Sequence, residues 1–414
     1  MRILYTLIGE IARYVLPLLA RFNPKIEQFQ NQRKTTSTDI AHWKQTQTSK
    51  PVLWLHCASL GEYEMIVPLI SNKSVQSTFE IVVSFFSSSG YKHAQTDGVV
   101  QGKFYLPLDR KKTMSKLVSH VNPSVFVLVK YDFWLNLMSA LNESNCTNLL
   151  VNGQFGSSQF ITTNWAFSWR NQLKKFKKIY AQNTDSAKLL ERFKFDNIIL
   201  SNDLRYDRAI QLKTKIHEIP TIEAFAQNQP TLILGSSWPE EEYIALQYLT
   251  SFNANIKAII APHDVSPSNI ERLQHEYREL NPKLFTDSDD FSDARVLILN
   301  NIGHLSNAYQ YATVAFVGGA FGKGLHNVLE AAVHGLPIFT GANIDKFPEA
   351  KALQKLGVLH PVAQDPRHFI ELMGTYDQKD SSNKHVEDIL RKWFEDQSGY
   401  SANIAQYLVG LNLN

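Results

Sequence analysis

Acidic, hydroxyl-bearing and glycine residues that could act on a sugar or a phosphate fall mainly in two stretches of the sequence. In the first, an apolar run ends at His56, the turn Cys57–Gly61 follows, and Glu62 opens a helical segment that extends to Ile70. The positive end of the helix dipole would favour an ionised carboxylate at Glu62, which suits a proton acceptor. A glutamate in a first helical turn can equally be a stabilising charge, and the residues alone favour that simpler role.

The second stretch, Thr313–Glu349, predicts a strand, a glycine-rich turn, a helix and a strand. Four glycines lie within residues 318–324, and Leu325–His334 has apolar residues at helical spacing. Unpaired N–H groups at the start of such a helix are a seat for phosphate, and Glu330, one turn further on, could accept hydrogen bonds from a ribose diol. The same glycines could serve only close packing of helix on sheet, because their spacing is not the dinucleotide fingerprint.

Other polar side chains follow predicted strands, and ligands bind beyond the carboxyl ends of strands in a parallel sheet. Ser236 and Ser237 could bond a phosphate or a sugar acid, or could cap the helix that follows them. Asp132 faces either a crevice or solvent. Arg205 could supply a guanidinium to an anionic substrate, or could belong to a surface ion-pair cluster.

Length and composition limit the classes of protein that fit. The 414 residues favour two domains, and the near balance of 42 basic and 39 acidic residues gives no indication of a nucleic-acid partner. Two cysteines, with no CxxC or HExxH motif, fit a reducing cytosolic environment and no structural zinc.

Short apolar runs alternate with helical patterns along most of the chain, which predicts an α/β fold with doubly wound parallel sheets. We place the domains at 27–210 and 211–385, with a helical segment at 386–414 and an N-terminal helix at 1–26. Residues 28–50 are expected to be a linker and residues 212–228 an interdomain connection. The predicted strands are 52–56, 80–84, 103–106, 125–129, 148–152, 178–181, 197–200, 231–235, 257–261, 295–299, 313–317 and 338–340.

Residues 1–26 predict an amphipathic helix. Eight apolar residues share one stripe, and Glu10 and Arg13 interrupt the run that a spanning helix would need. With several basic residues near it, the helix fits a membrane interface better than a span, and Pro17 is expected to kink it. The alternative is a helix packed on the protein's own core.

At this point the chain resembles a known family, the 3-deoxy-D-manno-octulosonic acid (Kdo) transferases of family GT30. These are inverting glycosyltransferases of the GT-B fold, in which two Rossmann-like domains face a central cleft. The resemblance covers nearly the whole chain, and each motif alone is weak. The motifs occur in the family's order: WLHCASLGE (54–62), FYLPLD (104–109), KYDFW (130–134), SNDLRYD (201–207), GSSWPEEE (235–242), IIAPHD (259–264), NIGHLSNAYQYATVAFVGGAFGKGLHNVLEAA (301–332) and FPEA (347–350).

The resemblance implies transfer of Kdo from CMP-Kdo to a lipid A precursor, lipid IVA, at the cytoplasmic face of the cell inner membrane. Domain 27–210 would hold the acceptor and domain 211–385 the donor, without a metal ion or other cofactor. The family's base falls on Glu62, and its stabilising acid and lysine fall on Asp132 and Arg205. Its CMP contacts fall on Pro262, His263, Ile302, Gly303, Asn327, Val328, Leu329 and Glu330.

The sequence departs from the family pattern at four positions. Lys130 stands where many members have an acid, Asp132 is shorter than the usual glutamate, Arg205 replaces lysine, and His263 stands where arginine commonly follows the proline. Two other functions stay open: a GT-B enzyme that uses another nucleotide sugar, and a catalytically silent, membrane-bound binder of nucleotide or glycolipid.

Overall fold

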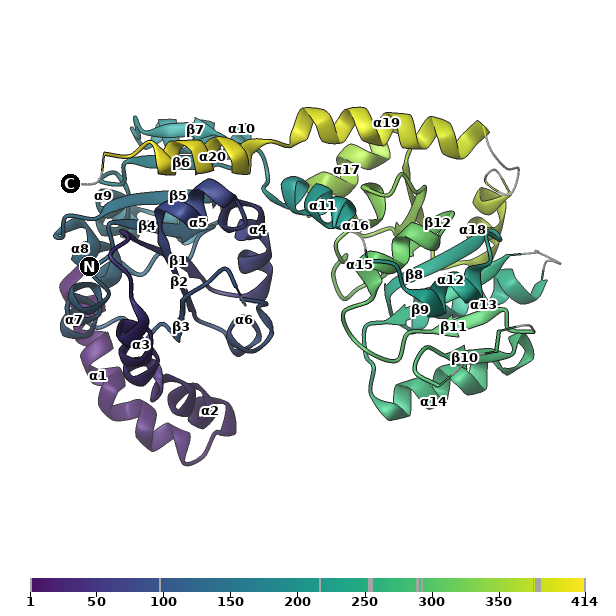
Figure 1. Cartoon of the computed structure of the whole chain (residues 1–414), viewed down its shortest axis with the longest axis horizontal. Coiled ribbons are helices and arrows are strands. Elements are labelled where there is room, and N and C mark those ends of the chain that lie inside the picture. Colours follow the sequence, from purple (N-terminus) through teal and green to yellow (C-terminus); the bar gives the residue numbers. More distant parts are fainter. Residues whose placement is uncertain are drawn as a thin grey trace. The chain divides into compact units, whose positions relative to one another are not determined.

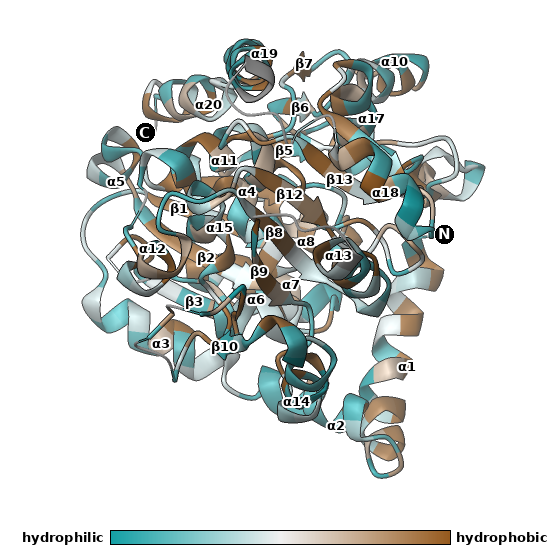
Figure 2. Ribbon diagram, turned by 90° about the vertical axis from the view of Figure 1, so that its right-hand side faces the viewer, coloured by the Kyte–Doolittle hydropathy of each residue, from teal (hydrophilic) through white to brown (hydrophobic). Residues whose placement is uncertain are grey.

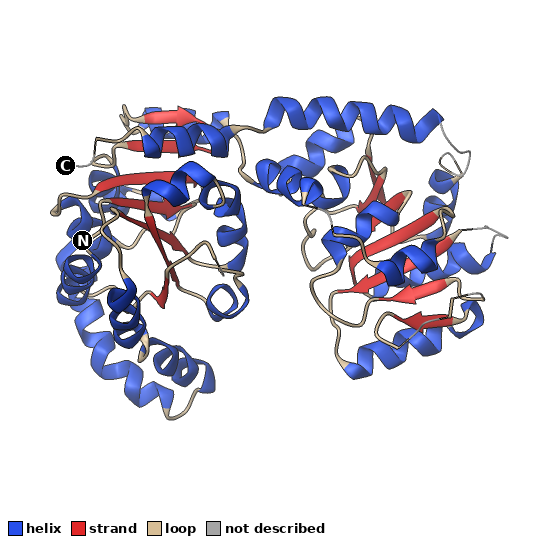
Figure 3. Cartoon of the chain, viewed as in Figure 1, coloured by secondary structure: helices blue, strands red, loops and turns tan. Residues whose placement is uncertain are grey.

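A computed structural model gives the architecture of residues 2–96, 98–215, 217–251, 256–287, 290–291, 293–374, 376 and 381–412. The chain forms two compact units, one made of Met1–Arg208 together with Gln397–Asn414 and the other of Ala209–Asp396. Each unit is a sheet covered by helices (Figures 1 and 3).

The sheet of unit 1 has seven parallel strands in the order β3-β2-β1-β4-β5-β6-β7. Neighbouring residues of one strand belong to hydrophobic cores on opposite faces of the sheet. Trp54 packs on one face, and Leu53 and Leu55 pack on the other. This burial on both faces explains why the strands are apolar runs rather than alternating patterns. The strands are β1 Val52–Cys57, β2 Glu80–Phe85, β3 Gly102–Tyr105, β4 Val125–Val129, β5 Thr147–Gly153, β6 Lys178–Ala181 and β7 Ile198–Leu200.

Helices surround this sheet. They are α1 Arg2–Ala20, α2 Pro24–Arg33, α3 Thr36–Thr46, α4 Leu60–Ile70, α5 Lys73–Thr78, α6 Ser88–His93, α7 Lys111–Val121, α8 Leu135–Asn142, α9 Phe167–Leu173, α10 Thr184–Arg192 and α20 Tyr400–Val409, with short 3₁₀ turns η1 Phe160–Thr162 and η2 Asn164–Ala166.

The sheet of unit 2 also has seven parallel strands, in the order β10-β11-β9-β8-β12-β13-β14. The strands are β8 Thr231–Ser237, β9 Lys257–Pro262, β10 Pro282–Leu284, β11 Val296–Ile298, β12 Val314–Val317, β13 Ile338–Gly341 and β14 Leu359–Val362. Unit 2 also contains α12 Pro220–Ala226, α13 Pro239–Ser251, α14 Pro267–Glu276, η3 Arg278–Leu280, α15 Leu305–Ala308, η4 Tyr309–Tyr311, α16 Leu329–Ala332, α17 Pro348–Lys355 and α18 Pro366–Met373.

In each sheet the strand order reverses at one place. In unit 1 the reversal lies between β1 and β4, and in unit 2 between β8 and β12. The connection after one of these two strands runs over one face of the sheet, and the connection after the other runs over the opposite face. A crevice therefore opens at the carboxyl ends of the two strands, and in doubly wound folds this crevice binds ligands. The topology therefore points to the loops after β1, β4, β8 and β12.

The linker expected at residues 28–50 is wrong. Most of it is helical, in α2 and α3, and Ile40 and Trp43 of α3 are buried against the sheet. The indole N–H of Trp43 donates to the Glu80 carboxylate at 2.9 Å. The segment resembles a linker in sequence because only a few apolar residues of an otherwise polar helix contact the core.

The interdomain connection expected at 212–228 is also wrong. The two units divide earlier, within the helix α11 Arg205–Thr214, and α12 buries Ile222 and Phe225 completely. The C-terminal segment is helical as expected, but it breaks at Gly399 (φ +94°) into α19 Ser381–Gln397 and α20, and Leu413 lies outside the described residues.

Helix α1 is amphipathic and lies on the surface of unit 1, where Tyr5 packs against a core cluster, so the alternative of a helix packed on the protein's own core holds in part. None of its residues, all of which are described, is buried, and nine of its large apolar side chains, Ile3 and Ile11 among them, are more than two-fifths exposed. Figure 2 shows brown stretches along its ribbon. The helix has the length and apolar composition to cross a membrane, which by itself is weak evidence that it does so.

The C-terminal helix α20 is held by one carboxylate of unit 1. Asp207, at the start of α11, accepts hydrogen bonds from the backbone N–H groups of Gly399 (2.5 Å) and Ser401 (2.7 Å). The carboxylate thus satisfies two N–H groups at the start of α20 that have no partner within the helix. It lies at the positive end of the helix dipole, where a negative charge is stabilising.

We expect Asp207→Ala to lower the free energy of unfolding of unit 1 by about 1–3 kcal/mol, because both N–H groups lose their acceptor in a partly buried site. Urea unfolding followed by circular dichroism measures it. The matched control is Asp388→Ala, which removes an exposed ion pair with Arg391 and should change stability by less than about 0.5 kcal/mol. Equal effects of the two substitutions would show that the cap contributes nothing.

Candidate active site

Glu62 lies in the first turn of α4, directly after β1 at the strand reversal of unit 1. Ser59 is the N-cap of this helix, and its Oγ accepts the N–H of Glu62 at 3.4 Å. The Glu62 carboxylate reaches back to accept the N–H of Ala58 at 2.5 Å. This reciprocal arrangement resembles a capping box and fixes the carboxylate at the carboxyl end of the sheet.

The Glu62 side chain is 6% exposed, and burial raises its pKa to about 7. The hydrogen bond from Ala58 opposes that rise, the charge of Asp132 adds to it, and the nearby Lys130 lowers it. The sequence suggested that the helix dipole would keep this carboxylate ionised, but burial outweighs the dipole. A carboxylate with a pKa near 7 is matched to general base catalysis at physiological pH.

Asp132 comes from the loop after β4, on the other side of the reversal. Its Oδ2 lies 3.8 Å from Nε2 of His56, the fully buried residue near the end of β1. The electrostatic effect of Asp132 on Glu62 places the two carboxylates in one site. The backbone turns sharply before this loop, since Lys130 has a φ of +63°, a conformation that costs about 1–3 kcal/mol for a residue with a side chain.

The hydrogen bonds of His56 define its protonation. The indole N–H of Trp134, which can only donate, points at Nε2 at 3.2 Å, so Nε2 carries no proton. The proton is on Nδ1 and is donated to Oγ of Ser84 at 2.9 Å, which also accepts the indole N–H of Trp54 at 2.8 Å. His56 is therefore a neutral side chain that connects the loop of Asp132 to the strands beneath it.

Arg205, the third expected catalytic residue, is paired within its own loop. Its guanidinium contacts the Asp203 carboxylate through Nη2 at 2.6 Å and Nε at 2.8 Å. Asp203 is buried and is also held by Gln182 and Asn152. The structure thus shows an ion pair of Arg205 with Asp203, although Asp203 is buried rather than at the surface. A role of Arg205 toward a substrate stays a prediction.

In unit 2, the glycine-rich turn after β12 approaches the start of α13. The N–H of Gly319 donates to Oε1 of Glu241 at 2.9 Å, and the N–H of Trp238 donates to Oε2 of the same carboxylate at 3.0 Å. Burial raises the pKa of Glu241 to about 7, and these two N–H groups oppose the rise. Glu241 thus connects the loops after β8 and β12.

Gly318 and Gly319 are required by these close approaches. A Cβ at Gly318 would lie 2.4 Å from the backbone oxygen of Ser236, and one at Gly319 would lie 2.3 Å from that of Gly324. Gly319 also has a φ of +94°, a conformation that side chains rarely adopt.

The helix expected at Leu325–His334 is wrong in extent. Only Leu329–Ala332 form α16, and the chain from Gly324 to Asn327 is irregular. The Asn327 side chain bridges the gap, accepting the N–H of Leu329 at 3.2 Å and donating to Glu330 at 2.9 Å. Because Gly324 precedes this stretch with a φ of +106° and Asn327 favours turns and caps, the helical spacing of the apolar residues does not extend the helix.

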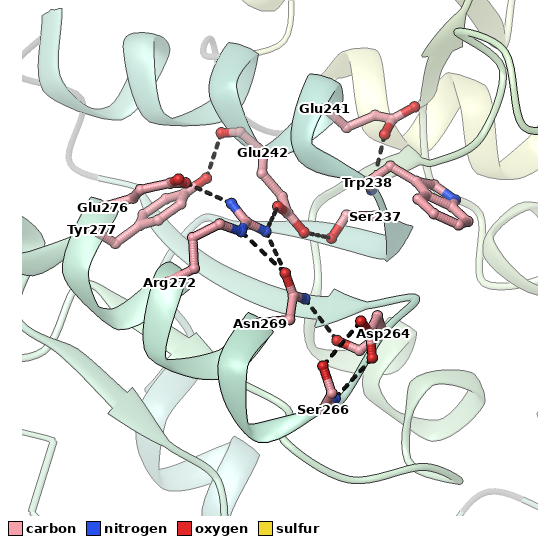
Figure 4. Close-up of polar contacts among 10 residues, drawn as sticks. All are labelled: Ser237, Trp238, Glu241, Glu242, Asp264, Ser266, Asn269, Arg272, Glu276 and Tyr277. Atoms are coloured by element: carbon pink, nitrogen blue, oxygen red, sulfur yellow. Dashed lines mark hydrogen bonds and ion pairs between the residues drawn. The ribbon is translucent and has the colours of Figure 1, made fainter.

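Ser236 and Ser237 differ in their surroundings. Ser237 is 2% exposed, and its hydroxyl donates inward to Glu242 at 2.8 Å; Glu242 in turn pairs with Arg272 at 2.6 Å (Figure 4). Ser236 is half-buried with a φ of +51°, at the point where β8 is irregular. Both remain candidate donor-binding residues.

An aromatic stack stands beside this strand end. His263, directly after β9 and Pro262, stacks on Trp238 at 4.4 Å between ring centroids and lies 4.8 Å from His326. The indole N–H of Trp238 donates to Nε2 of His326 at 3.3 Å. Burial, and then the charge of His263, lower the pKa of His326, which suits the neutral acceptor that this bond requires.

The remaining candidate residues lie on the loop before α15 and beside it. Ile302 is 84% exposed and Gly303 has a φ of +104°. Ser306, in α15, donates to the carboxylate of Glu330 at 2.5 Å, which joins this loop to residues 327–330, Val328 and Leu329 included. Glu330 is thus held by protein groups on both oxygens.

Sequence reasoning missed four residues that organise these sites: His56, Trp134, Glu241 and His326. Each of these residues lies inside one of the family motifs, but the residue that it contacts lies elsewhere in the sequence. The contact can be recognised only once the strands are paired in the fold. Among the described residues, no three His, Cys, Asp or Glu side chains gather in a way that could hold a metal ion.

Two doubly wound units, each with polar residues at the strand reversal, are the architecture of the GT-B fold. Residues 30–208 match the sequence model of the family described as 3-deoxy-D-manno-octulosonic-acid transferase (kdotransferase). Over these residues the chain is similar to the Kdo transferase family, and this similarity indicates a glycosyltransferase.

Curated relatives agree with this assignment. The chain is 25% identical over 323 residues to the 3-deoxy-D-manno-octulosonic acid transferase of Chlamydophila psittaci, covering 71% of this chain and 70% of the relative. It is 22% identical over 426 residues to the bifunctional glycosyltransferase/methyltransferase of Fusobacterium nucleatum, covering 97% of this chain but 63% of the relative. The UDP-GlcNAc 2-epimerase from Neisseria meningitidis, solved bound to UDP-GlcNAc, shares the fold: the TM-score is 0.59 at 12% identity, over 87% of this chain and 98% of that one.

Proposed function

We propose that this glycosyltransferase transfers Kdo from CMP-Kdo to a lipid A precursor, with inversion at the anomeric carbon. The observation that carries the proposal is Glu62, a buried carboxylate with a pKa of about 7 at the strand reversal of unit 1. The match of residues 30–208 to the Kdo transferase family supports the donor sugar. The same carboxylate argues against a silent binder, because a buried carboxyl with a strongly raised pKa at a strand reversal is typical of a functional site.

In the proposed reaction, the carboxylate of Glu62 takes the proton of an acceptor hydroxyl. The hydroxyl oxygen attacks the anomeric carbon of Kdo, the bond from that carbon to the phosphate oxygen breaks, and CMP leaves with the bonding electrons. Asp132 and Arg205 are the proposed stabilising residues on unit 1. His56, neutral and fixed by Trp134 and Ser84, orients the loop that carries Asp132.

The proposed donor residues lie on unit 2, in the loops after β8, β9 and β12 and before α15. They are Ser236, Ser237, Pro262, His263, Ile302, Gly303, Asn327, Val328, Leu329 and Glu330. We propose that backbone N–H groups of the glycine-rich turn, rather than a cation, face the phosphate. We propose a location on the cytoplasmic face of the inner membrane, and the exposed apolar face of α1 supports association with a membrane.

The test is CMP release from CMP-Kdo in the presence of tetraacyl lipid A precursor, with the product identified by mass spectrometry. The proposal expects release that depends on the acceptor, and no turnover of UDP- or GDP-sugars. Turnover of another nucleotide sugar instead would identify a different GT-B enzyme. Binding of CMP without any turnover would identify a silent binder.

Metal independence is a separate prediction. We expect transfer to continue at an unchanged rate after dialysis against EDTA, because helix termini and backbone N–H groups can take the place of a cation. The assay is the same CMP release, with and without added Mg²⁺. A loss of activity that Mg²⁺ restores would show that the donor site needs a metal.

A further inference from the structure

A cavity of about 450 Å³ opens in unit 1 beside the loop of Asp132. Three separate parts of the chain line it: helix α1, the loop after β4, and the segment from η1 to α9. The side chains that matter here are Leu4, Ile8, Asp132, Trp134, Phe160 and Trp169.

Hydrogen bonds and ring contacts connect the walls of this cavity. The hydroxyl of Tyr5 donates to Asp109 at 2.8 Å, and the indole N–H of Trp169 donates to the backbone oxygen of Phe133 at 2.9 Å. The ring of Trp169 meets those of Tyr5 and Phe160 edge-on, at 5.1 and 4.9 Å between centroids. The cavity is therefore preformed, and the surface that it offers is aromatic and aliphatic.

The lining of the cavity combines two kinds of chemistry. Leu4 and Ile8, which are 50% and 57% exposed, belong to the apolar face of α1. Asp132 carries the one charge among the lining side chains and lies beside His56. A molecule that binds in this cavity must therefore be apolar over most of its length and must carry hydrogen-bond donors for the carboxylate of Asp132.

We propose that this cavity binds one fatty acyl chain of the glycolipid acceptor and so brings the acceptor sugar to Asp132 and Glu62. The proposal rests on the proposed function, because it assumes a lipid acceptor. A phosphodiester headgroup of bulk membrane lipid would be repelled by Asp132, whereas the hydroxyls of a sugar would donate to it.

Charged residues also lie beside α1, but they do not line the cavity. Arg110 pairs with Glu10 at 2.6 Å, and Arg13 and Lys112 are close enough to act on the same carboxylate. Because Glu10 and Ile8 are two residues apart in a helix, this cluster lies on the opposite side of α1 from the cavity.

The experiment compares Ile8→Ser with Ile11→Ser in detergent micelles. Both isoleucines are exposed on α1, 57% and 52%, but only Ile8 lines the cavity. We expect Ile8→Ser to raise the KM for the tetraacyl acceptor roughly tenfold, the equivalent of about two buried methylenes, with kcat unchanged. Phe160→Ser is expected to act like Ile8→Ser, and Ile11→Ser to leave the KM unchanged.

A second readout separates this proposal from the proposed function. An acceptor with brominated acyl chains should quench the tryptophan fluorescence of the wild type in the absence of donor, and Ile8→Ser should weaken that quenching. Quenching without any Kdo transfer would support the cavity and sink the proposed reaction. Equal effects of Ile8→Ser and Ile11→Ser on KM and quenching, or no effect of either, would overturn the cavity and leave the reaction standing.

Discussion

Replacing Glu62 by glutamine is expected to lower kcat for Kdo transfer by a factor of roughly 10²–10⁴, the usual contribution of a general base. Glutamine keeps the size of the side chain and can still accept the N–H of Ala58, so the start of α4 should stay intact. CMP binding should be unchanged, because the candidate donor residues lie on unit 2. The assay is acceptor-dependent CMP release, with CMP affinity from calorimetry.

The pH dependence gives an independent check on this base. Glu62 must be ionised to accept a proton, so the rate for the wild type should rise as the pH increases through about 7. The matched control is Glu64→Gln on the same helix. The Glu64 side chain pairs with Arg208 and is 39% exposed. We expect Glu64→Gln to keep the rate and its pH profile; a Glu62→Gln protein that transfers Kdo at the wild-type rate would remove Glu62 from the mechanism.

Glu62→Gln should also stabilise the fold at alkaline pH. The pKa of Glu62 rises from 4.5 to about 7 on folding, so the folded protein binds the proton more tightly. Its contribution to stability is therefore complete below pH 4.5 and is lost as the pH rises through 7, a loss of about 3 kcal/mol. Glu62→Gln should unfold at a higher temperature than the wild type at pH 8 and not at pH 4; a fall at pH 8 would contradict the buried-charge argument.

The second large effect is expected from Gly319→Ala, which should abolish measurable CMP binding and cost about 2–4 kcal/mol of stability. Its Cβ would lie 2.3 Å from the backbone oxygen of Gly324, and alanine is strained at a φ of +94°. Backbone cannot yield as a flexible side chain can, so the turn must move. That movement breaks the hydrogen bond from Gly319 to Glu241, which joins the loops after β8 and β12.

The same turn offers a matched control. A Cβ on Gly322 meets no atom within 4 Å, and its φ lies outside the positive range, so Gly322→Ala should keep both CMP affinity and melting temperature. Calorimetry with CMP and thermal unfolding measure the pair of variants. Equal CMP affinity in the Gly319 and Gly322 variants would mean that the shape of this turn is irrelevant to the donor.

Much of the fold could be predicted from the sequence because buried parallel strands are recognisable as short runs of apolar residues. All twelve predicted strands are present, within two residues at either end. Strand β10, Pro282–Leu284, and β14, Leu359–Val362, escaped because the first is short and the second contains His360 and Pro361. These strands lie at the edges of the sheet, where polar residues and proline are tolerated.

The site was less predictable, since its chemistry depends on contacts between distant residues. The position of Glu62 in a helix start could be predicted, but its raised pKa depends on the burial that the folded sheet imposes. The inward hydroxyl of Ser237 follows from Glu242 and Arg272, which pack beneath it. In α16 the spacing of apolar residues predicted more helix than forms, because the local preferences of glycine and asparagine prevail.

The return of α20 to unit 1 has a consequence for biosynthesis. Ile404, Ala405 and Leu408 complete a core that otherwise consists of residues before 205. A ribosome delivers those three side chains only after it has made all of unit 2, so the half of the protein that is synthesised first is finished last. Until then the nascent chain exposes the apolar faces of α4 and α5, a surface of the kind that chaperones bind.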